Sequence, residues 1–334
     1  MRIAVDAMGG DSAPAVEVEG AIQIIPELNG HQIVLVGDQR EIEAVAAPHG
    51  GLPSDVAICH ASQAVGMADK PVEAIRRKPD SSIARCIKMI GSGEADAVVS
   101  AGNTGAVVAL ATLKLGLLEG VRRPGIAVAM PTHEGGTTLV IDCGANLKCT
   151  PENLLQFGIM AAAYSRHVFG REDPRIGLLN IGQESIKGTK LVRRADALFQ
   201  DSPLAYVGYV EGREVFSGAA DVVVCEGFVG NVLLKVSEGL AGTILAMMKE
   251  AIQRTLRRRI GAMLCKYAML ELAAKVDSSE SGGAPLLGVN GTCMICHGGS
   301  DSRAIAVAIR CAAEAAAYRV NEHILSDLRV CCPS

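Results

Sequence analysis

The sequence contains no tryptophan and has only five phenylalanines and five tyrosines among its 334 residues. Its charges are nearly balanced, with 32 Lys and Arg against 36 Asp and Glu. Proteins that bind nucleic acid present a basic surface, and those that bind single strands add aromatic side chains on which bases stack. Both features are scarce in this chain, so the sequence predicts no nucleic-acid partner.

A signal peptide and a long uncharged apolar run are also missing. The opening residues MRIAVDAMGG lack the charged and apolar regions of a secretory signal. No run of about 18 apolar residues without charges occurs, so we expect no spanning helix, although a helix that lies on a membrane is not excluded. The 11 cysteines are diluted in a long chain, unlike those of small disulfide-rich secreted domains. We therefore expect a cytoplasmic protein.

Short runs rich in Val and Ile alternate with longer helical segments, and several runs are apolar on both faces. A strand that is covered on both faces shows no polar alternation, so the pattern predicts an α/β fold: a large open, mainly parallel sheet with helices on both faces. Helices are expected to begin at Pro71, Ser81 and Pro151. No linker or repeat is visible, so residues 1–334 are predicted to form a single α/β catalytic domain. The predicted strands are 2–8, 32–38, 55–62, 95–102, 125–132, 137–145, 175–182, 221–227 and 291–299.

Glycine-rich turns follow six of these strands. Ligands of open α/β sheets bind beyond the carboxyl ends of strands, where glycine lets the backbone approach and helix amino termini offer N–H groups to anions. Because the turns also carry Asn, Thr, Ser, Asp or Lys, they indicate a pocket for a phosphate or carbonyl group. No P-loop, dinucleotide fingerprint, nucleophile elbow or His-Glu-x-x-His is present, so nucleotide binding, serine hydrolysis and zinc proteolysis lose support. The six turns are DAMGGD, SAGNTGA, DCGAN, NIGQES, EGFVGN and HGGSD.

The stretch from Cys293 to His297 has the Cys-x-x-Cys-His spacing of covalent haem attachment. Such a short motif arises readily by chance, and haem is normally attached outside the cytoplasm. No second Cys-x-x-Cys pair completes a zinc site, and most cysteines are expected to be small apolar core residues. The sequence therefore predicts neither a haem nor a metal.

Several polar side chains in the turns have two interpretations each. Lys187 lies near a predicted helix start, where it either balances a bound anion or is a solvated loop lysine. Asn231 either caps the helix that follows, which is the default, or donates to a substrate carbonyl. Asn103 and Thr104 carry the same ambiguity, and a single histidine such as His297 is more often a hydrogen-bonded core residue than a catalyst.

Seven ordered blocks of the sequence form a common pattern: residues 1–11, 99–106, 141–146, 178–188, 226–235, 282–291 and 297–301. Together they resemble the bacterial phosphate acyltransferase family, which makes acyl phosphates from acyl-acyl carrier protein in phospholipid synthesis. The resemblance extends over nearly the whole chain. It implies a fold shared with phosphotransacetylases and the isocitrate and isopropylmalate dehydrogenases, a homodimer, no metal or nucleotide cofactor, and peripheral attachment to the inner face of the cytoplasmic membrane. It also makes CMIC a buried strand and HGGSD its phosphate-facing turn, so the haem spacing is coincidental.

The resemblance also implies the site and the partners. It assigns Lys187 to the charge of phosphate or of the developing oxyanion, and Asn231 to orienting the thioester carbonyl, with acyl carrier protein and inorganic phosphate as substrates. The implied substrate-binding residues are Asp6, Gly9, Gly10, Asn103, Thr104, Gly105, His297, Gly298 and Ser300. The chain departs from the family pattern at Ser12, where histidine is common, at Glu226, which replaces aspartate, and at Ser278 and Ser281, which replace tyrosines.

A basic amphipathic helical segment is predicted at about 240–276. Its part from Ala246 to Lys266 contains six Lys or Arg and one Glu among Met, Leu and Ile. Such a helix can rest on an anionic membrane surface or meet an acidic carrier protein. An equally supported alternative is that the segment forms a helix pair at a dimer interface, with its basic face exposed to solvent.

Three other functions compete with the implied one. The first is a phosphotransacylase that uses short-chain acyl-coenzyme A, and the second is an NAD-dependent hydroxyacid dehydrogenase on the related fold. The dehydrogenase needs a metal-binding aspartate cluster, which the sequence does not reveal. The third is a non-catalytic membrane scaffold, which only the basic helix supports.

Overall fold

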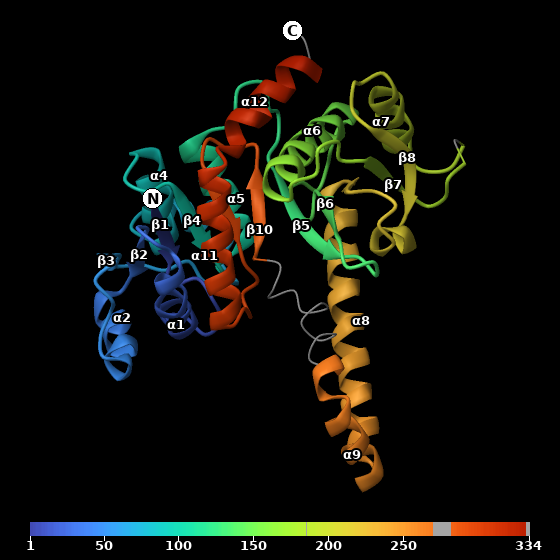
Figure 1. Cartoon of the computed structure of the whole chain (residues 1–334). Helices are drawn as coiled ribbons and strands as arrows, with labels where there is room; N and C mark the ends of the chain where they lie inside the picture. Colours follow the sequence, from blue (N-terminus) through green and yellow to red (C-terminus); the bar gives the residue numbers. More distant parts are fainter. Residues whose placement is uncertain (185, 270–281, 332–334) are drawn as a thin grey trace.

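The computed structural model describes residues 1–184, 186–269 and 282–331 (Figure 1). They form an 11-stranded sheet in the order β3-β2-β1-β4-β11-β10-β5-β6-β9-β7-β8. The first half of the sheet consists of β3, β2, β1, β4 and β11, and the second half consists of β5, β6, β9, β7 and β8. Strand β10 joins the two halves. The strands are β1 (Arg2–Asp6), β2 (Gln32–Gly37), β3 (Val56–His60), β4 (Ala97–Ser100), β5 (Gly125–Pro131), β6 (Thr137–Ile141), β7 (Ile176–Asn180), β8 (Tyr206–Glu211), β9 (Val222–Val224), β10 (Ala284–Leu287) and β11 (Thr292–Ile295).

Helices connect most of the strands. The longer ones are α1 (Ala15–Ile24), α2 (Gln39–Ala46), α3 (Pro71–Arg77), α4 (Ser82–Gly91), α5 (Thr104–Leu110), α6 (Pro151–Val168), α7 (Lys190–Gln200), α8 (Gly227–Gln253), α9 (Leu256–Leu264), α11 (Ser302–Ala317) and α12 (Val320–Cys331). Short turns of other helix types are η1 (Ile25–Glu27), η2 (Ala47–His49), η3 (Ala111–Leu115) and η4 (Gly212–Phe216).

The predicted fold class is confirmed, and each of the nine predicted strands is present. Two strands, β8 and β10, were not predicted. Strand β8 lies at the sheet edge, and Gly208 interrupts its apolar pattern. Strand β10 is only four residues long and contains Pro285, which is unfavourable in a strand. Most strand pairs are parallel; β10 is antiparallel to both neighbours, and β5 is antiparallel to β6. As a result, the carboxyl end of β6 lies beside the start of β5.

Both faces of the first half are covered, as the apolar runs predict. Ile3 and Val5 of β1 pack into a cluster with residues of α1 and α11, whereas Ala4 packs into a different cluster with residues of α4 and α5. Alternate side chains of a strand point to opposite faces, so a strand that is covered twice must be apolar throughout. In the second half, α6 and α7 cover one face around the fully buried Phe157 and Phe199.

The three predicted helix starts are also confirmed. Pro71 is the first residue of α3 and Pro151 the first of α6, where the missing N–H of proline costs no hydrogen bond. Thr150 caps α6 in a reciprocal arrangement with Asn153. Ser81 occupies the cap position of α4, although its side chain makes no capping hydrogen bond.

Helix α8 projects away from the sheet, and α9 lies against its far end (Figure 1). By length and composition, α8 is able to cross a membrane, so the sequence-based argument against a spanning helix is too strong. One such helix is weak support for a span, because buried helices of other proteins pass the same test. The predicted basic segment falls on α8 and α9 as far as residue 269, and residues 270–276 lie outside the described part of the chain.

Candidate functional site

A cavity of about 660 Å³ is lined from both halves of the sheet. Its walls come from the residues that follow β4, β6 and β11, from the start of α11, and from one face of α8. The polar residues that line it are Thr104, Asn231, Lys235, Glu238, His297, Ser300 and Asp301. The larger apolar ones are Ile126, Val128, Leu234 and Ile295. The cavity therefore offers polar groups beside an apolar wall.

Five of the predicted site residues line this cavity, although they are up to 196 positions apart in the sequence. Thr104 and Gly105 come from the start of α5, His297 and Ser300 follow β11, and Asn231 lies on α8. The Nδ1 atom of His297 accepts a hydrogen bond from the Gly299 N–H at 3.1 Å, which leaves Nε2 as the protonated nitrogen when the ring is neutral.

Four other predicted residues do not line the cavity: Asp6, Gly9, Gly10 and Gly298. The buried carboxylate of Asp6 accepts a hydrogen bond from the Ser100 hydroxyl at 2.7 Å, and burial raises the pKa of Asp6. A side chain at Gly9 would lie 2.7 Å from the Asp6 carboxylate and 2.7 Å from the Gly102 nitrogen, so only glycine fits there.

The turn that contains Gly9 and Gly10 is joined to the turn that follows β11. The Asp11 N–H donates to the Gly298 carbonyl at 2.8 Å. Below them, the fully buried Glu17 of α1 lies against Gly10, and neither of its carboxylate oxygens has a hydrogen-bond partner among the described residues. Burial is the main reason that the pKa of Glu17 rises to about 7. Sequence analysis did not single out this residue, because a glutamate on a predicted helix is normally solvated.

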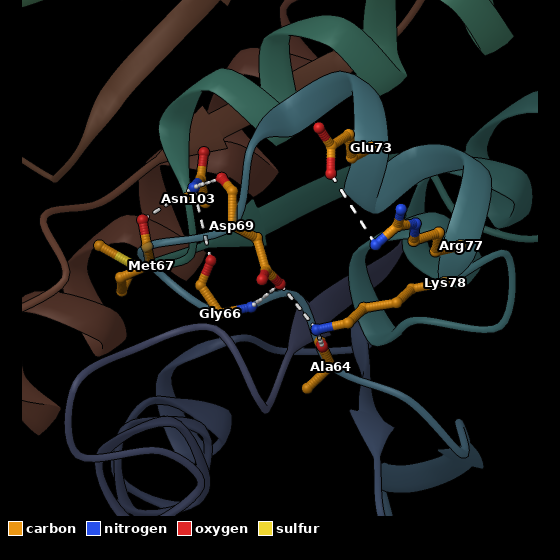
Figure 2. A network of polar contacts seen from close by, with 8 residues as sticks. All are labelled: Ala64, Gly66, Met67, Asp69, Glu73, Arg77, Lys78 and Asn103. Atoms are coloured by element: carbon orange, nitrogen blue, oxygen red, sulfur yellow. Dashed lines mark hydrogen bonds and ion pairs between the residues drawn. The ribbon is translucent and has the colours of Figure 1, made fainter.

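Asn103 has a structural use for its side chain. Its Oδ1 accepts a hydrogen bond from the Ala106 N–H at 3.1 Å and caps α5, as one of the two interpretations expects. Its Nδ2 donates to the carbonyls of Met67 and Asp69, at 3.0 Å each (Figure 2). Asp69 is in turn bound by the Lys78 ammonium at 2.6 Å, which lowers the pKa of that carboxyl. Asn103 therefore holds residues 66–69, which we call the strap, and does not line the cavity.

Asn231 is held in place by the turn that follows β6. Asp142 fixes this turn by accepting backbone hydrogen bonds from Gly144, Ala145 and Asn146 at 2.8 to 3.1 Å. Gly144 lies against Asn231, which would be 3.6 Å from a side chain at that glycine.

The default interpretation of Asn231 as a helix cap is wrong. Helix α8 begins at Gly227, with Glu226 in the cap position, so Asn231 lies one turn inside the helix. Its amide has no hydrogen-bond partner among the described residues, and it faces the cavity. Glu226, one of the departures from the family pattern, makes no capping hydrogen bond with its side chain. Ser12 is exposed, and Ser278 and Ser281 lie outside the described residues.

Lys187 does not line the cavity. It lies in the turn that follows β7, and its ammonium is 2.7 Å from the Glu184 carboxylate. Strands β6, β9 and β7 are parallel neighbours, so the turn with Asp142 and the turn with Lys187 leave the same edge of the sheet, from strands that are two spacings or roughly 10 Å apart.

Two charged residues of the cavity, Lys235 and Glu238, were not identified from the sequence. Both belong to α8, four and seven residues beyond Asn231. This spacing places all three on one face of a helix, which is a signal that the sequence contained.

Cys293 and Cys296 lie in and just after β11, and both thiols are buried. They belong to two different core clusters, on opposite faces of the sheet, so they cannot hold one haem. Burial raises the pKa of each thiol to about 12. Within the described ranges, no group of three or more His, Cys, Asp or Glu side chains is arranged to hold a metal ion. The expectation of a metal-free site stays a prediction.

The chain matches a family described as "Fatty acid synthesis protein" over residues 1–323. It is 49% identical over 329 residues to the phosphate acyltransferase of Geotalea daltonii, and 50% identical over 328 residues to that of Geobacter sulfurreducens. Each match covers 98% of this chain and 94% of the relative.

Solved structures of similar fold include a phosphotransacetylase from Streptococcus pyogenes, with a TM-score of 0.63 and 17% identity over 94% of each chain. A branched-chain phosphotransacylase from Enterococcus faecalis has a TM-score of 0.59 and 15% identity, over 95% of this chain and 99% of its own. At this level of identity the likeness shows the fold alone, and it confirms the predicted fold shared with phosphotransacetylases.

Proposed function

The chain belongs to the phosphate acyltransferase family, and we propose that it makes acyl phosphate from long-chain acyl-acyl carrier protein and inorganic phosphate, feeding phospholipid synthesis. One observation carries this proposal: Asn231, Thr104 and the turn from His297 to Ser300 meet in one cavity beside an apolar wall. The polar groups suit a phosphate and a thioester carbonyl, and the apolar wall suits the first carbons of an acyl chain.

In the proposed step, a phosphate oxygen attacks the thioester carbonyl carbon. A C–O bond forms, the C–S bond breaks, and the electron pair leaves on sulfur as the thiolate of the carrier's phosphopantetheine arm, which then takes a proton from water. Phosphate is already an anion at neutral pH, so no side chain needs to act as the nucleophile. The protein must instead hold the two reactants in line and stabilise the charge that develops on the carbonyl oxygen.

Asn231 is the proposed donor to that oxygen, which its free amide and its position in the cavity support. Lys187 is proposed to act on phosphate or oxyanion charge from the same edge of the sheet. Because Lys187 forms an ion pair with Glu184, this ion pair must break before the lysine can bind the substrate. Asp6, Gly9, Gly10 and Gly298 are proposed to fix the turns whose backbone N–H groups face the phosphate, which their contacts with one another's turns support.

A phosphotransacylase that uses short-chain acyl-coenzyme A remains the alternative. The apolar cavity wall of Ile126, Val128 and Leu234 favours a longer chain. Comparing the turnover of long-chain acyl-acyl carrier protein with that of short-chain acyl-coenzyme A, at equal phosphate, decides between the two.

We also propose that the protein is a homodimer on the inner face of the cytoplasmic membrane. An exposed apolar stripe on α8, formed by Val236, Leu240, Ile244 and Met247, supports the dimer. On α9, Leu256 and Leu264 are 73% and 83% exposed, which suits a helix that rests on a membrane. Arg258 and Arg259 donate to the carbonyls of Ala251 and Gln253, so they stabilise the end of α8 in addition to any contact with anionic lipid.

The test of the proposed reaction is phosphate-dependent loss of the thioester from acyl-acyl carrier protein, with acyl phosphate as the product and no added metal. Asn231→Ala and Lys187→Ala should fold normally and lose on the order of 100-fold or more in turnover, as when one oxyanion donor is removed. Asn29→Ala and Lys88→Ala, at exposed positions away from the cavity, serve as controls. No phosphate-dependent reaction in the wild type, or activity that is lost on chelation and restored by a divalent ion, would contradict the proposal.

A further inference from the structure

Lys235 is the one lysine or arginine among the described residues that line the cavity. It lies on α8, four residues beyond Asn231, so the two side chains leave the same helix face about 6 Å apart along the axis. Neither side chain has an ion-pair or hydrogen-bond partner within the part of the chain that the structure describes.

The charge of the cavity makes this lysine important. Two of its lining residues, Glu238 and Asp301, carry carboxylates. Asp301 is partly used as the cap of α11, where it accepts a hydrogen bond from the Ala304 N–H at 2.8 Å. Glu238 forms no ion pair with Lys235 among the described contacts. A phosphate that enters this cavity meets two negative groups, so its binding requires a cation at the same place.

Lys187 does not supply that cation in this structure. Its ammonium is paired with Glu184 and lies outside the cavity. Lys235 is exposed and extends from the cavity wall, so it can meet an incoming anion without first breaking an ion pair.

We infer that Lys235 binds the inorganic phosphate substrate through its ammonium group, while Asn231 holds the thioester carbonyl one helical turn away; this inference rests on the proposed function. The spacing supports the division of roles. Reacting atoms must approach to about 3–3.5 Å, and groups that are held by two long side chains about 6 Å apart along one helix face are close enough to be brought together. Lys235 is thus a further catalytic residue of the proposed reaction.

The first test measures binding of inorganic phosphate to the full-length protein by isothermal titration calorimetry, without the acyl substrate. Lys235→Met should weaken binding at least tenfold, because a charged contact to phosphate is removed, whereas Lys235→Arg should retain most of it. Lys88→Met, an exposed lysine on α4, is the matched control and should bind as the wild type does. Thermal melting verifies that each variant is folded.

The second test separates the substrates by kinetics. Lys235→Met should raise KM for phosphate and leave KM for acyl-acyl carrier protein unchanged. If only KM for acyl-acyl carrier protein rises, the lysine binds the phosphate of the carrier's arm and the inference is overturned. It is also overturned if the folded variant binds phosphate as tightly as Lys88→Met does. If wild-type protein binds phosphate through Lys235 but shows no turnover, the proposed function fails and the phosphate site stands.

Discussion

At the scale of single residues, Asp142 and Glu17 are both buried carboxyl groups, and they differ in their hydrogen bonds. Asp142 accepts backbone N–H groups on both oxygens, together with the Asn146 side-chain amide at 2.9 Å. Glu17 has no such partner among the described residues. A buried carboxylate without donors is unfavourable, so Glu17 holds its proton to higher pH.

We predict that Glu17 makes stability depend on pH between about 4.5 and 7. Its pKa is about 7 in the folded protein and 4.5 ordinarily, so in this range the folded state keeps a proton that the unfolded state has released. Stability therefore falls as the pH rises through this range and stays reduced above it. Glu17→Gln removes the unfavourable burial of a negative charge, and it should raise the free energy of unfolding at pH 8 by up to roughly 3 kcal/mol.

The measurement is urea unfolding of both proteins at pH 5, 6, 7 and 8. The gain from Glu17→Gln should grow with pH up to about 7 and then level off. Glu19→Gln, on the same helix, is the control. A gain that is the same at every pH would show that Glu17 is not the titrating group.

At the scale of elements, α8 and α5 both begin beside turns that reach the cavity. A glycine contact positions the first turns of α8, and a polar cap fixes the start of α5. Gly230 of α8 packs directly on the Asp142 carbonyl, where a larger residue cannot fit. This contact sets the position of Asn231 and Lys235 on the cavity wall. At α5, the Asn103 side chain caps the helix and also holds the strap at residues 66–69 (Figure 2).

For Asn103, we predict that its main role is to hold the strap. Asn103→Ala should cost about 1 kcal/mol in stability through the lost cap, and it should also release the strap. Asn103→Asp keeps the capping oxygen but loses the Nδ2 donors, so it should release the strap with a smaller loss of capping. Hydrogen exchange of the backbone between residues 64 and 70, followed by mass spectrometry, measures the release.

Thr189→Ala is the matched control, because Thr189 caps α7 through its Oγ1 and has no contact with the strap. It should cost a similar free energy and leave exchange at residues 64–70 unchanged. Unchanged exchange in both Asn103 variants would instead assign Asn103 to the substrate.

At the scale of the whole molecule, the residues that the structure describes leave a long apolar stripe of α8 uncovered. Val236, Leu240, Ile244 and Met247 follow one another at helical spacing and are 55–65% exposed. A stripe of this kind on a 27-residue helix indicates packing against another surface. A second α8 from another copy is self-complementary and would cover it.

From this stripe we predict a dimer that depends on Leu240 and Ile244. The double substitution Leu240→Glu and Ile244→Glu places charges in the interface and should give monomers in sedimentation velocity experiments, while the wild type sediments as a dimer. Val72→Glu, at an exposed apolar position on α3, is the control and should remain dimeric. A monomeric wild type, or a double variant that stays dimeric, would show that the stripe has another role.

The sequence by itself determined the features that depend on near neighbours along the chain. Apolar runs such as 32–37 and 222–224 specify buried strands because both strand faces are covered, and Pro71 and Pro151 specify helix starts because proline fits the first turn. The glycine turns predicted a polar pocket, and Thr104, Asn231, His297 and Ser300 do line one cavity.

Only the tertiary structure decided which polar groups remain available in that cavity. Asn103 donates to carbonyls 34 to 37 positions away, and Lys187 pairs with Glu184. Lys235 lines the cavity and has no ion-pair or hydrogen-bond partner among the residues that the structure describes. Glu17 is buried because α1 packs against α11, nearly 300 residues further along the chain. The availability of a hydrogen-bonding or charged group depends on every neighbour in space, and most of those neighbours are distant in the sequence.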